Sequence, residues 1–168
     1  MSKSSTLTGL FRPAIIQDAR KIHSLIKIYA DKGEMLPRSL NDLFEFIRQY
    51  TIYEEEGKTL GVCGLHVSWE DLAEVRALAV DPNHANRGIG SKLLKMALLE
   101  AKRLGIYKVF ALTYIPEFFE KQGFKTVDKR EFPQKIWGEC VSCHKFPNCD
   151  ETGMIVYLQS NSDGKTDS

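Results

Sequence analysis

The sequence predicts an α/β protein, α+β in some classifications, with a mixed, twisted sheet of about seven strands flanked by about four helices. Three observations lead to this class. Candidate strands and amphipathic helices follow one another in the order β α α β β β α β α β β. The early strands are joined by short turns, which is typical of antiparallel hairpins. A later β-α-β segment needs a crossover connection and therefore predicts a parallel pair.

The first part of the chain predicts one strand and two helices. Leu10–Ile16 is the strand candidate, and Asp18 is placed to cap a helix that reaches about Ala30. After an exposed basic loop at residues 34–38, Ser39 starts a second helix with a capping-box-like pattern. Apolar residues recur at helical spacing in both helices: Ile22, Leu25, Ile26 and Tyr29 in the first, and Leu40, Leu43, Phe44 and Ile47 in the second.

A β-hairpin is expected next, from Tyr50–Glu54 through a tight turn to Thr59–Trp69. Gly61 and Gly64 lie inside its second strand and indicate a bulge or a close approach of another backbone segment.

The rest of the chain alternates strands and helices. The strand Val75–Val80 leads through a polar loop into a long helix that Gly105 ends. Its buried face is predicted from Leu93, Leu94, Ala97, Leu98, Ala101 and Leu104. The remaining elements are strands at Lys108–Leu112, Phe124–Val127 and Met154–Leu158, and a short helix at Pro116–Gln122. Residues 1–159 are expected to form a single domain, and residues 160–168 a disordered tail.

Composition excludes several classes of partner. The 168 residues are 43% hydrophobic and 27% charged, as in ordinary globular proteins. The net charge is only +1, which gives no electrostatic argument for nucleic acid or an anionic membrane. No apolar run approaches the roughly 20 residues of a membrane span, and the N-terminus has no secretory h-region. We therefore expect a cytoplasmic protein that binds neither nucleic acid nor a membrane, and that could form a homodimer.

The segment Glu74–Leu104 has the pattern of an anion-binding turn. A strand, a loop with Gly88 and Gly90, and a helix N-terminus bring free backbone N–H groups and the positive end of the helix dipole together. A dinucleotide-binding motif is excluded because its third glycine would fall at Leu93. A Walker loop is excluded because the lysine and hydroxyl residues after the second glycine are in reverse order. The two glycines would also suit a tight turn without a ligand.

The letters around this turn resemble a known family. LAVDPNHANRGIGSKLLKMAL, followed by FFEKQGF, is similar to the acetyl-CoA signature of the GCN5-related N-acetyltransferase (GNAT) superfamily. Similarity runs from Arg12 to about Leu158. Three shorter segments resemble the amino-acid acetyltransferases of the N-acetylglutamate synthase type: Leu36–Ser39, Glu74–Val80, and Phe110–Thr113 leading to Glu117–Phe119.

The resemblance implies the GNAT fold and transfer of an acetyl group from acetyl-CoA to the α-amino group of an amino acid. L-Glutamate is the expected acceptor, which would make this reaction the first step of arginine biosynthesis. The alternatives are an acetyltransferase for a peptide, protein or other small amine, and a non-catalytic CoA- or metal-binding sensor.

The resemblance also implies how acetyl-CoA is held. Backbone N–H groups would cradle the pyrophosphate, and a strand backbone would pair with the pantetheine arm while one of its amides faces the thioester oxygen. The implied cofactor residues are Asn86, Arg87, Gly88, Ile89, Gly90 and Ser91 in the turn, Leu78, Ala79 and Val80 in the strand, and Phe119.

The turn departs from the family pattern at one position. The family's Gln or Arg, three residues before the first glycine, is Ala85 here, so the grip is expected to come from the backbone. Arg87 could add a side-chain contact to a phosphate or stay solvated. Asn86 stands where glycine is common and is expected to adopt a left-handed conformation, which asparagine tolerates.

Acetyl transfer to an amine needs a base, because a free α-amino group has a pKa of about 8. Glu74 matches the glutamate of the synthase motif and is the candidate base. Thr113, which matches a serine or threonine of that motif, and the adjacent Tyr114 are candidate acids for the leaving thiolate. Phe119 replaces the tyrosine that many superfamily members use. Glu74, Thr113 and Tyr114 would also suit ordinary strand ends without a catalytic role.

An acidic acceptor such as glutamate carries two carboxylates, so its site needs cations. Arg38 matches the synthase motif and can bind a carboxylate bidentately. Arg76 and Lys135 are further candidates. Glu74 and Arg76 are two residues apart on one strand, so their side chains point to the same face. They could therefore form a salt bridge with each other instead of serving as base and substrate-binding cation.

The chain contains four cysteines. Cys140, Cys143 and Cys149 form a late cluster that, with His144 or Asp150, could hold a structural zinc ion. Free thiols and a redox disulfide are the alternatives. Cys63 is interpreted as a small buried hydrophobic residue.

Overall fold

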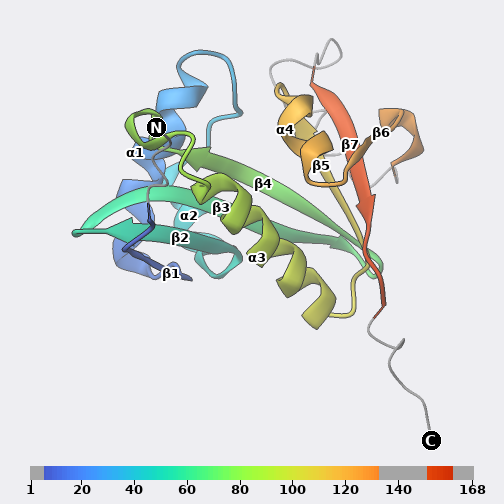
Figure 1. Cartoon of the computed structure of the whole chain (residues 1–168), viewed down its shortest axis with the longest axis horizontal. Helices are drawn as coiled ribbons and strands as arrows, with labels where there is room; N and C mark the ends of the chain where they lie inside the picture. The colour runs from blue at the N-terminus through green and yellow to red at the C-terminus, as the bar shows by residue number, and fades with distance from the viewer. Residues whose placement is uncertain (1–5, 133–150, 161–168) are drawn as a thin grey trace, which may run out of the picture. The chain divides into compact units, whose positions relative to one another are not determined.

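A computed structural model describes residues 6–132 and 151–160, and Figure 1 shows its elements. The strands are β1 (Leu10–Pro13), β2 (Tyr50–Glu55), β3 (Lys58–Trp69), β4 (Leu72–Val80), β5 (Lys108–Thr113), β6 (Lys125–Thr126) and β7 (Thr152–Tyr157). The α-helices are α1 (Ala19–Ala30), α2 (Leu40–Glu45), α3 (Ile89–Arg103) and α4 (Pro116–Lys121). The strands form a mixed sheet in the order β1-β2-β3-β4-β5-β7-β6. The predicted fold class is confirmed.

Two compact units share this sheet. The first contains Met1–His66 and Val75–Glu100, and the second contains Val67–Glu74 and Ala101–Ser168. The expectation of a single domain stays a prediction. No helix among the described residues is long and apolar enough to cross a membrane.

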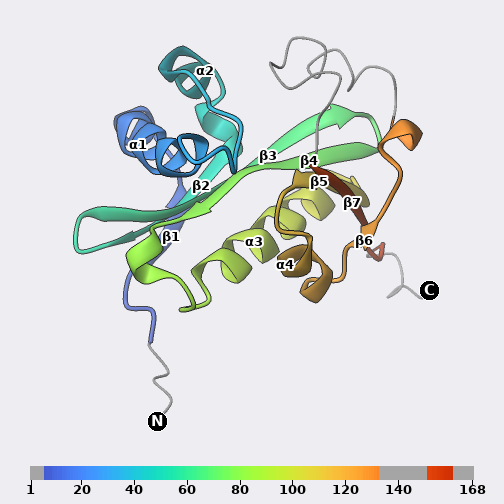
Figure 2. The ribbon, with the colours of Figure 1, turned by 90° about the horizontal axis from the view of Figure 1, so that it is seen from above.

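In the first unit, antiparallel strands carry helices on both faces. β1 pairs with β2 and β2 pairs with β3, with Tyr50 opposite Gly64. Figure 2 shows α1 and α2 on one side of β2 and β3, and α3 on the other. The predicted stripe of α1 enters a core with strand residues from this sheet: Ile22, Leu25, Ile26, Ile52, Val62 and Ala79.

The second unit contains the parallel pair that the crossover predicted. β4 pairs with β5 in parallel through Ala73–Val109 and Glu74–Phe110. β5 and β6 both pair antiparallel with β7. The ring of Phe110 packs on that of Phe132, with 4.5 Å between centroids, and Leu72 completes this small core.

Several predicted details differ in the structure. The first strand ends at Pro13 rather than Ile16. Asp18 does stand at the N-cap position of α1, but its side chain does not cap the helix. Its buried carboxylate instead accepts hydrogen bonds from the Ile15 N–H (2.8 Å) and from both Nη atoms of Arg12 (2.8 and 2.9 Å). A buried carboxylate needs charged or N–H partners, and this pairing competes with capping.

Helix boundaries and exposure also differ. The second helix ends at Glu45 and is followed by a 3-10 turn at Ile47–Gln49. Leu104 lies beyond the end of α3 and is 54% exposed, so it does not belong to the buried face. The loop expected to be exposed holds three half-buried residues, Met35, Leu36 and Arg38.

Candidate active site

The turn before α3 has the geometry of an anion-binding nest. Ala85 is extended (φ −66°, ψ 158°), whereas Asn86 (φ 66°) and Gly88 (φ 86°) are left-handed, with Arg87 between them. Alternation of backbone handedness points successive N–H groups into one concavity. The prediction that Asn86 is left-handed is confirmed. Helix α3 begins directly after the nest, and its dipole adds positive potential there.

Close packing fixes where α3 starts. Ile89 is 1% exposed and Leu93 is fully buried, and both contact β3 at Gly61. A Cβ atom on Gly61 would lie 2.7 Å from Ile89 Cγ2 and 2.8 Å from Leu93 Cδ1. The close neighbours of Gly61 are therefore side chains from the first turn of α3 and not a backbone, while the pairing of β2 with β3 shifts register next to Gly61, as the bulge alternative predicted.

Arg87 is held by an ion pair. Its Nη2 lies 3.0 Å from Glu55 Oε1, its Nη1 lies 3.3 Å from Glu55 Oε2, and its Nη1 also lies 2.9 Å from His84 Nδ1. The hydrogen bond to Glu55 raises the pKa of Arg87 above its ordinary value. The solvated alternative does not describe this side chain, which is 18% exposed.

Strand β4 is irregular in the stretch expected to meet the pantetheine arm. Ala77 is left-handed (φ 53°) within the strand, a conformation that costs a non-glycine residue free energy and locally disrupts the regular ladder. Leu78 and Val80 are half-buried, and Ala79 is buried in the core under α1. The Tyr29 hydroxyl of α1 donates to the Val80 carbonyl and anchors the end of the strand.

Two of the predicted cations, Arg38 and Arg76, interact electrostatically with the buried Tyr50 in the first unit. Burial raises the pKa of Tyr50; the positive charges of Arg38 and Arg76 oppose this rise, and the Asp42 carboxylate adds to it. Arg38 Nη1 lies 3.6 Å from Asp42 Oδ2, and its side chain is 18% exposed.

Gly64 makes room for this tyrosine. A Cβ atom there would lie 2.8 Å from Tyr50 Cε1 and 3.3 Å from the Arg76 carbonyl oxygen. The close approach expected at Gly64 is therefore confirmed. A side chain at position 64 would collide with the Tyr50 ring.

The candidate base and acids lie in the second unit. Glu74 is half-buried and opposite Phe110, so the two side chains share a face of the sheet. Thr113 lies three residues further along β5, which places its side chain on the opposite face. It is 7% exposed, and its Oγ1 accepts a hydrogen bond from the Ile115 N–H (2.9 Å), which leaves the hydroxyl proton to donate elsewhere. The Tyr114 hydroxyl oxygen is shielded from solvent.

Phe119 lies in an aromatic cluster of the second unit. It is 4% exposed and packs edge-on against Phe118 (5.3 Å between centroids) and Phe124 (5.1 Å). These contacts make it a core residue of α4, and its assignment to the cofactor stays a prediction.

Lys135 and the cluster Cys140, Cys143 and Cys149 lie outside the described residues, as does most of the predicted tail. Within residues 6–132 and 151–160, no group of three or more His, Cys, Asp or Glu side chains could hold a metal ion. The zinc hypothesis stays a prediction.

Comparison with known proteins identifies the family. A family model for an acetyltransferase (GNAT) domain matches residues 47–126. An uncharacterized N-acetyltransferase of Chlorobaculum tepidum, CT2212, is 38% identical over 147 residues, which are 88% of this chain and 95% of that protein. The chain belongs to the GNAT acetyltransferases. An amino-acid acetyltransferase of Mycobacterium tuberculosis is 34% identical to this GNAT protein over 76% of this chain and 75% of the relative.

Solved structures agree with this membership. Rv2747 of Mycobacterium tuberculosis, determined in complex with CoA, has a TM-score of 0.78 to this GNAT protein at 29% identity, over 89% of this chain and 99% of that one. N-acetylglutamate synthase from Neisseria gonorrhoeae, determined with coenzyme A and N-acetyl-glutamate, has a TM-score of 0.81 at 26% identity. The match covers 92% of this chain but 36% of the synthase.

The residues that hold Arg87 and the end of β4 could not be identified from the sequence. Glu55, which pairs with Arg87, is 32 residues away, and Tyr29 is 51 residues from the carbonyl that it holds. Neither pairing leaves a local pattern. The one available signal was Gly64, which indicated a bulge or a close backbone approach without identifying Tyr50.

Proposed function

We propose that this GNAT protein transfers the acetyl group of acetyl-CoA to the α-amino group of an acidic amino acid, with L-glutamate as the first candidate. The relatives support this proposal, since those that match most of the chain include an amino-acid acetyltransferase and a synthase solved with N-acetyl-glutamate. Such an activity would serve the first step of arginine biosynthesis.

One observation carries the choice of an acidic acceptor. The positive charges of Arg38 and Arg76, which are far apart in sequence, both lower the pKa of the buried Tyr50, and this supports a site for an anionic group near that side chain, where Arg38 also pairs with Asp42 at 3.6 Å. A carboxylate bound there could accept hydrogen bonds from a guanidinium group. A polyamine or lysine acceptor would instead need carboxylates at these positions.

The proposed chemistry assigns one task to each remaining group. The nest of Asn86, Arg87 and Gly88 binds the pyrophosphate through backbone N–H groups, and Glu74 takes the proton from the acceptor amine as its nitrogen attacks the thioester carbonyl. The C–S bond then breaks, and Thr113 or Tyr114 protonates the departing thiolate. The attacking nitrogen and the departing sulfur are bonded to the same carbon, whereas Glu74 and Thr113 project from opposite faces of the sheet, which favours Tyr114 over Thr113 as the acid that works with Glu74.

The test is a thiol-release assay with acetyl-CoA and each of the 20 amino acids, followed by Arg38→Leu with the best acceptor. We expect L-glutamate to be among the best acceptors and Arg38→Leu to raise its KM by about tenfold or more, with a smaller effect on the KM for acetyl-CoA. Transfer only to neutral or basic amines would refute the proposal. A preference for glutamine over glutamate would keep amino-acid acetylation and remove the acidic acceptor.

A further inference from the structure

Four side chains of the first unit connect strand β2 to the loop before α3. The Tyr53 hydroxyl donates to Glu55 Oε1 (2.6 Å), and the Glu55 carboxylate accepts both Nη groups of Arg87. His84 completes the set through its Nδ1 contact with Arg87. We call Tyr53, Glu55, His84 and Arg87 the loop clamp.

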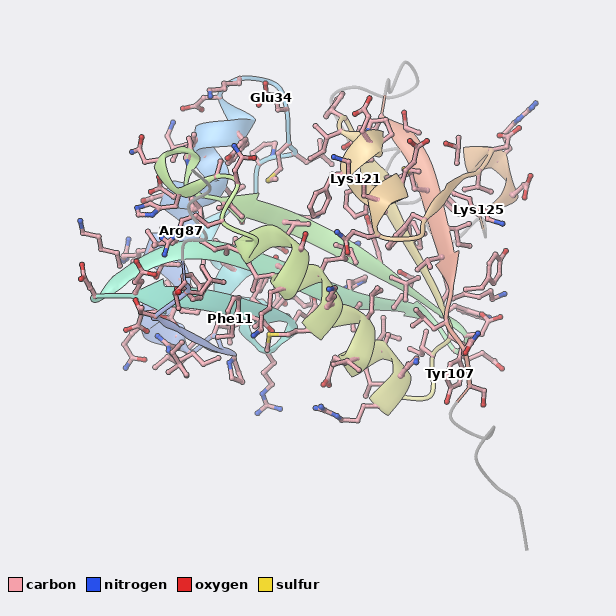
Figure 3. The ribbon with its side chains drawn as sticks, viewed as in Figure 1. Phe11, Glu34, Arg87, Tyr107, Lys121 and Lys125 are labelled. Atoms are coloured by element: carbon pink, nitrogen blue, oxygen red, sulfur yellow. The ribbon has the colours of Figure 1, made fainter. Side chains whose placement is uncertain are left out.

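The strand end of the clamp is anchored in the core. Tyr53 is fully buried, and its ring packs on Phe11 with 4.5 Å between centroids. Its hydroxyl also accepts a hydrogen bond from the Gly9 N–H (2.9 Å). Arg87, labelled with Phe11 in Figure 3, forms the loop end of the clamp. The clamp therefore ties the loop to a rigid part of the sheet.

The charges of the clamp are balanced. Hydrogen bonds from Tyr53 and then from Arg87 lower the pKa of Glu55, so this carboxylate is ionised at neutral pH. Its partner Arg87 is a permanent cation. The side chains are 16% and 18% exposed, which limits competition from water. The ion pair thus fixes the position of Arg87 without adding net charge to the loop.

Arg87 is the middle residue of the nest. Its neighbours Asn86 and Gly88 are both left-handed, and for asparagine this conformation costs of order 1 kcal/mol. A loop that leaves this conformation no longer points its N–H groups at an anion. Apparent affinity falls in proportion to the fraction of molecules with the nest formed.

We propose that Glu55, oriented by Tyr53, is a positioning residue that holds Arg87 and so keeps the nest in the conformation that binds the pyrophosphate of acetyl-CoA. This inference rests on the assignment of the loop to the cofactor in the proposed function. It gives Arg87 a structural task, because both of its Nη atoms are already engaged by Glu55 and His84.

The sign of the effect separates positioning from simple electrostatics. A carboxylate near an anion site weakens anion binding through its field, so its neutralisation alone would tighten CoA binding. Loss of the nest conformation would weaken CoA binding. The two explanations therefore predict changes in opposite directions for the same substitution.

The experiment is calorimetric titration of Glu55→Gln with CoA and with dephospho-CoA, which keeps the pyrophosphate and lacks the 3′-phosphate. If the nest is formed in about one variant molecule in ten, Kd rises about tenfold for both ligands. With S-acetylpantetheine, which has no phosphate, the variant should keep the wild-type kcat/KM for whichever acceptor the wild type uses. The control is Glu56→Gln, which removes the same charge from the exposed neighbouring turn and should bind CoA as the wild type does.

Unchanged or tighter CoA binding by Glu55→Gln would overturn the proposal, as would an equal loss with S-acetylpantetheine. Tyr53→Phe keeps the ring and removes the donor to Glu55; it should weaken CoA binding by a smaller factor, and it provides the test if Glu55→Gln is unstable. A wild-type protein that binds CoA but acetylates no amino acid would refute the proposed function while the titrations still decide the role of Glu55. Absence of CoA binding in the wild type would refute both.

Discussion

Substitution of Gly61 by alanine should separate cofactor binding from acceptor binding. The new methyl group would lie 2.7 and 2.8 Å from carbon atoms of Ile89 and Leu93, about 1 Å inside optimal contact. Overpacking of a buried site by a methyl group costs about 1–3 kcal/mol, from which Gly→Ala recovers about 0.4–1 kcal/mol by restricting the unfolded chain. A net loss of about 1–2 kcal/mol of unfolding free energy follows.

The displaced residues are the first turn of α3, so the nest should move with them. We expect the Kd for acetyl-CoA to rise about tenfold or more, because a misplacement of about 1 Å is costly in a preorganised site. Urea unfolding measures the free energy of unfolding, and calorimetric titration with acetyl-CoA measures the Kd. KM for the acceptor should stay within about twofold of the wild type.

Gly64→Ala is the matched control on the opposite face of the same strand. Its methyl group would press on the rigid ring of Tyr50, so we expect a similar loss of unfolding free energy. The displaced Tyr50 should raise the KM for the acceptor, while the Kd for acetyl-CoA should stay unchanged. Wild-type stability of Gly61→Ala would refute the packing argument. A destabilised Gly61→Ala with wild-type affinity for acetyl-CoA would refute the link between the start of α3 and the cofactor.

Three further predictions concern single side chains. Burial opposes ionisation of Asp18, but hydrogen bonds from Arg12 and from the Ile15 N–H outweigh the effect of burial and lower the pKa of Asp18. The stability that the ionised Asp18 contributes is therefore complete above about pH 4, and it is lost as the pH falls through the folded-state pKa. Asp18→Asn should therefore lower the free energy of unfolding in urea at pH 7 by about 1.5–3 kcal/mol and show a weaker loss of stability on acidification; equal acid sensitivity would contradict this. Burial raises the pKa of Cys63 to about 12, so iodoacetamide at pH 8 should leave it unmodified in the native protein and label it after unfolding, as read by peptide mass spectrometry; rapid labelling of the native thiol would refute its burial. Glu74→Gln should lower kcat by about 10²- to 10⁴-fold with unchanged affinity for acetyl-CoA, whereas full activity would remove Glu74 as the base.

The sequence predicted most of the fold because local patterns specify it. Helical spacing identified the buried stripe of α1, and the alternation of hairpin turns with a crossover gave both strand directions. Gly105 and Asn86 were placed correctly because a left-handed backbone restricts the residue type at that position. Errors occurred where a side chain had two local uses, as at Asp18, whose carboxylate pairs with Arg12 instead of capping α1.

The candidate site divides in the same way. The nest, its glycine and the helix that follows are encoded within a few residues, so the sequence alone predicted an anion-binding turn and, through its motifs, the GNAT family. The tertiary structure decided that Glu55 holds Arg87 and that the charges of Arg38 and Arg76 both affect the buried Tyr50. These contacts join residues tens of positions apart, and they depend on strand register, including the shift between Tyr53 and Glu54. Register is a property of the assembled sheet, which is why no local pattern could have specified these pairings.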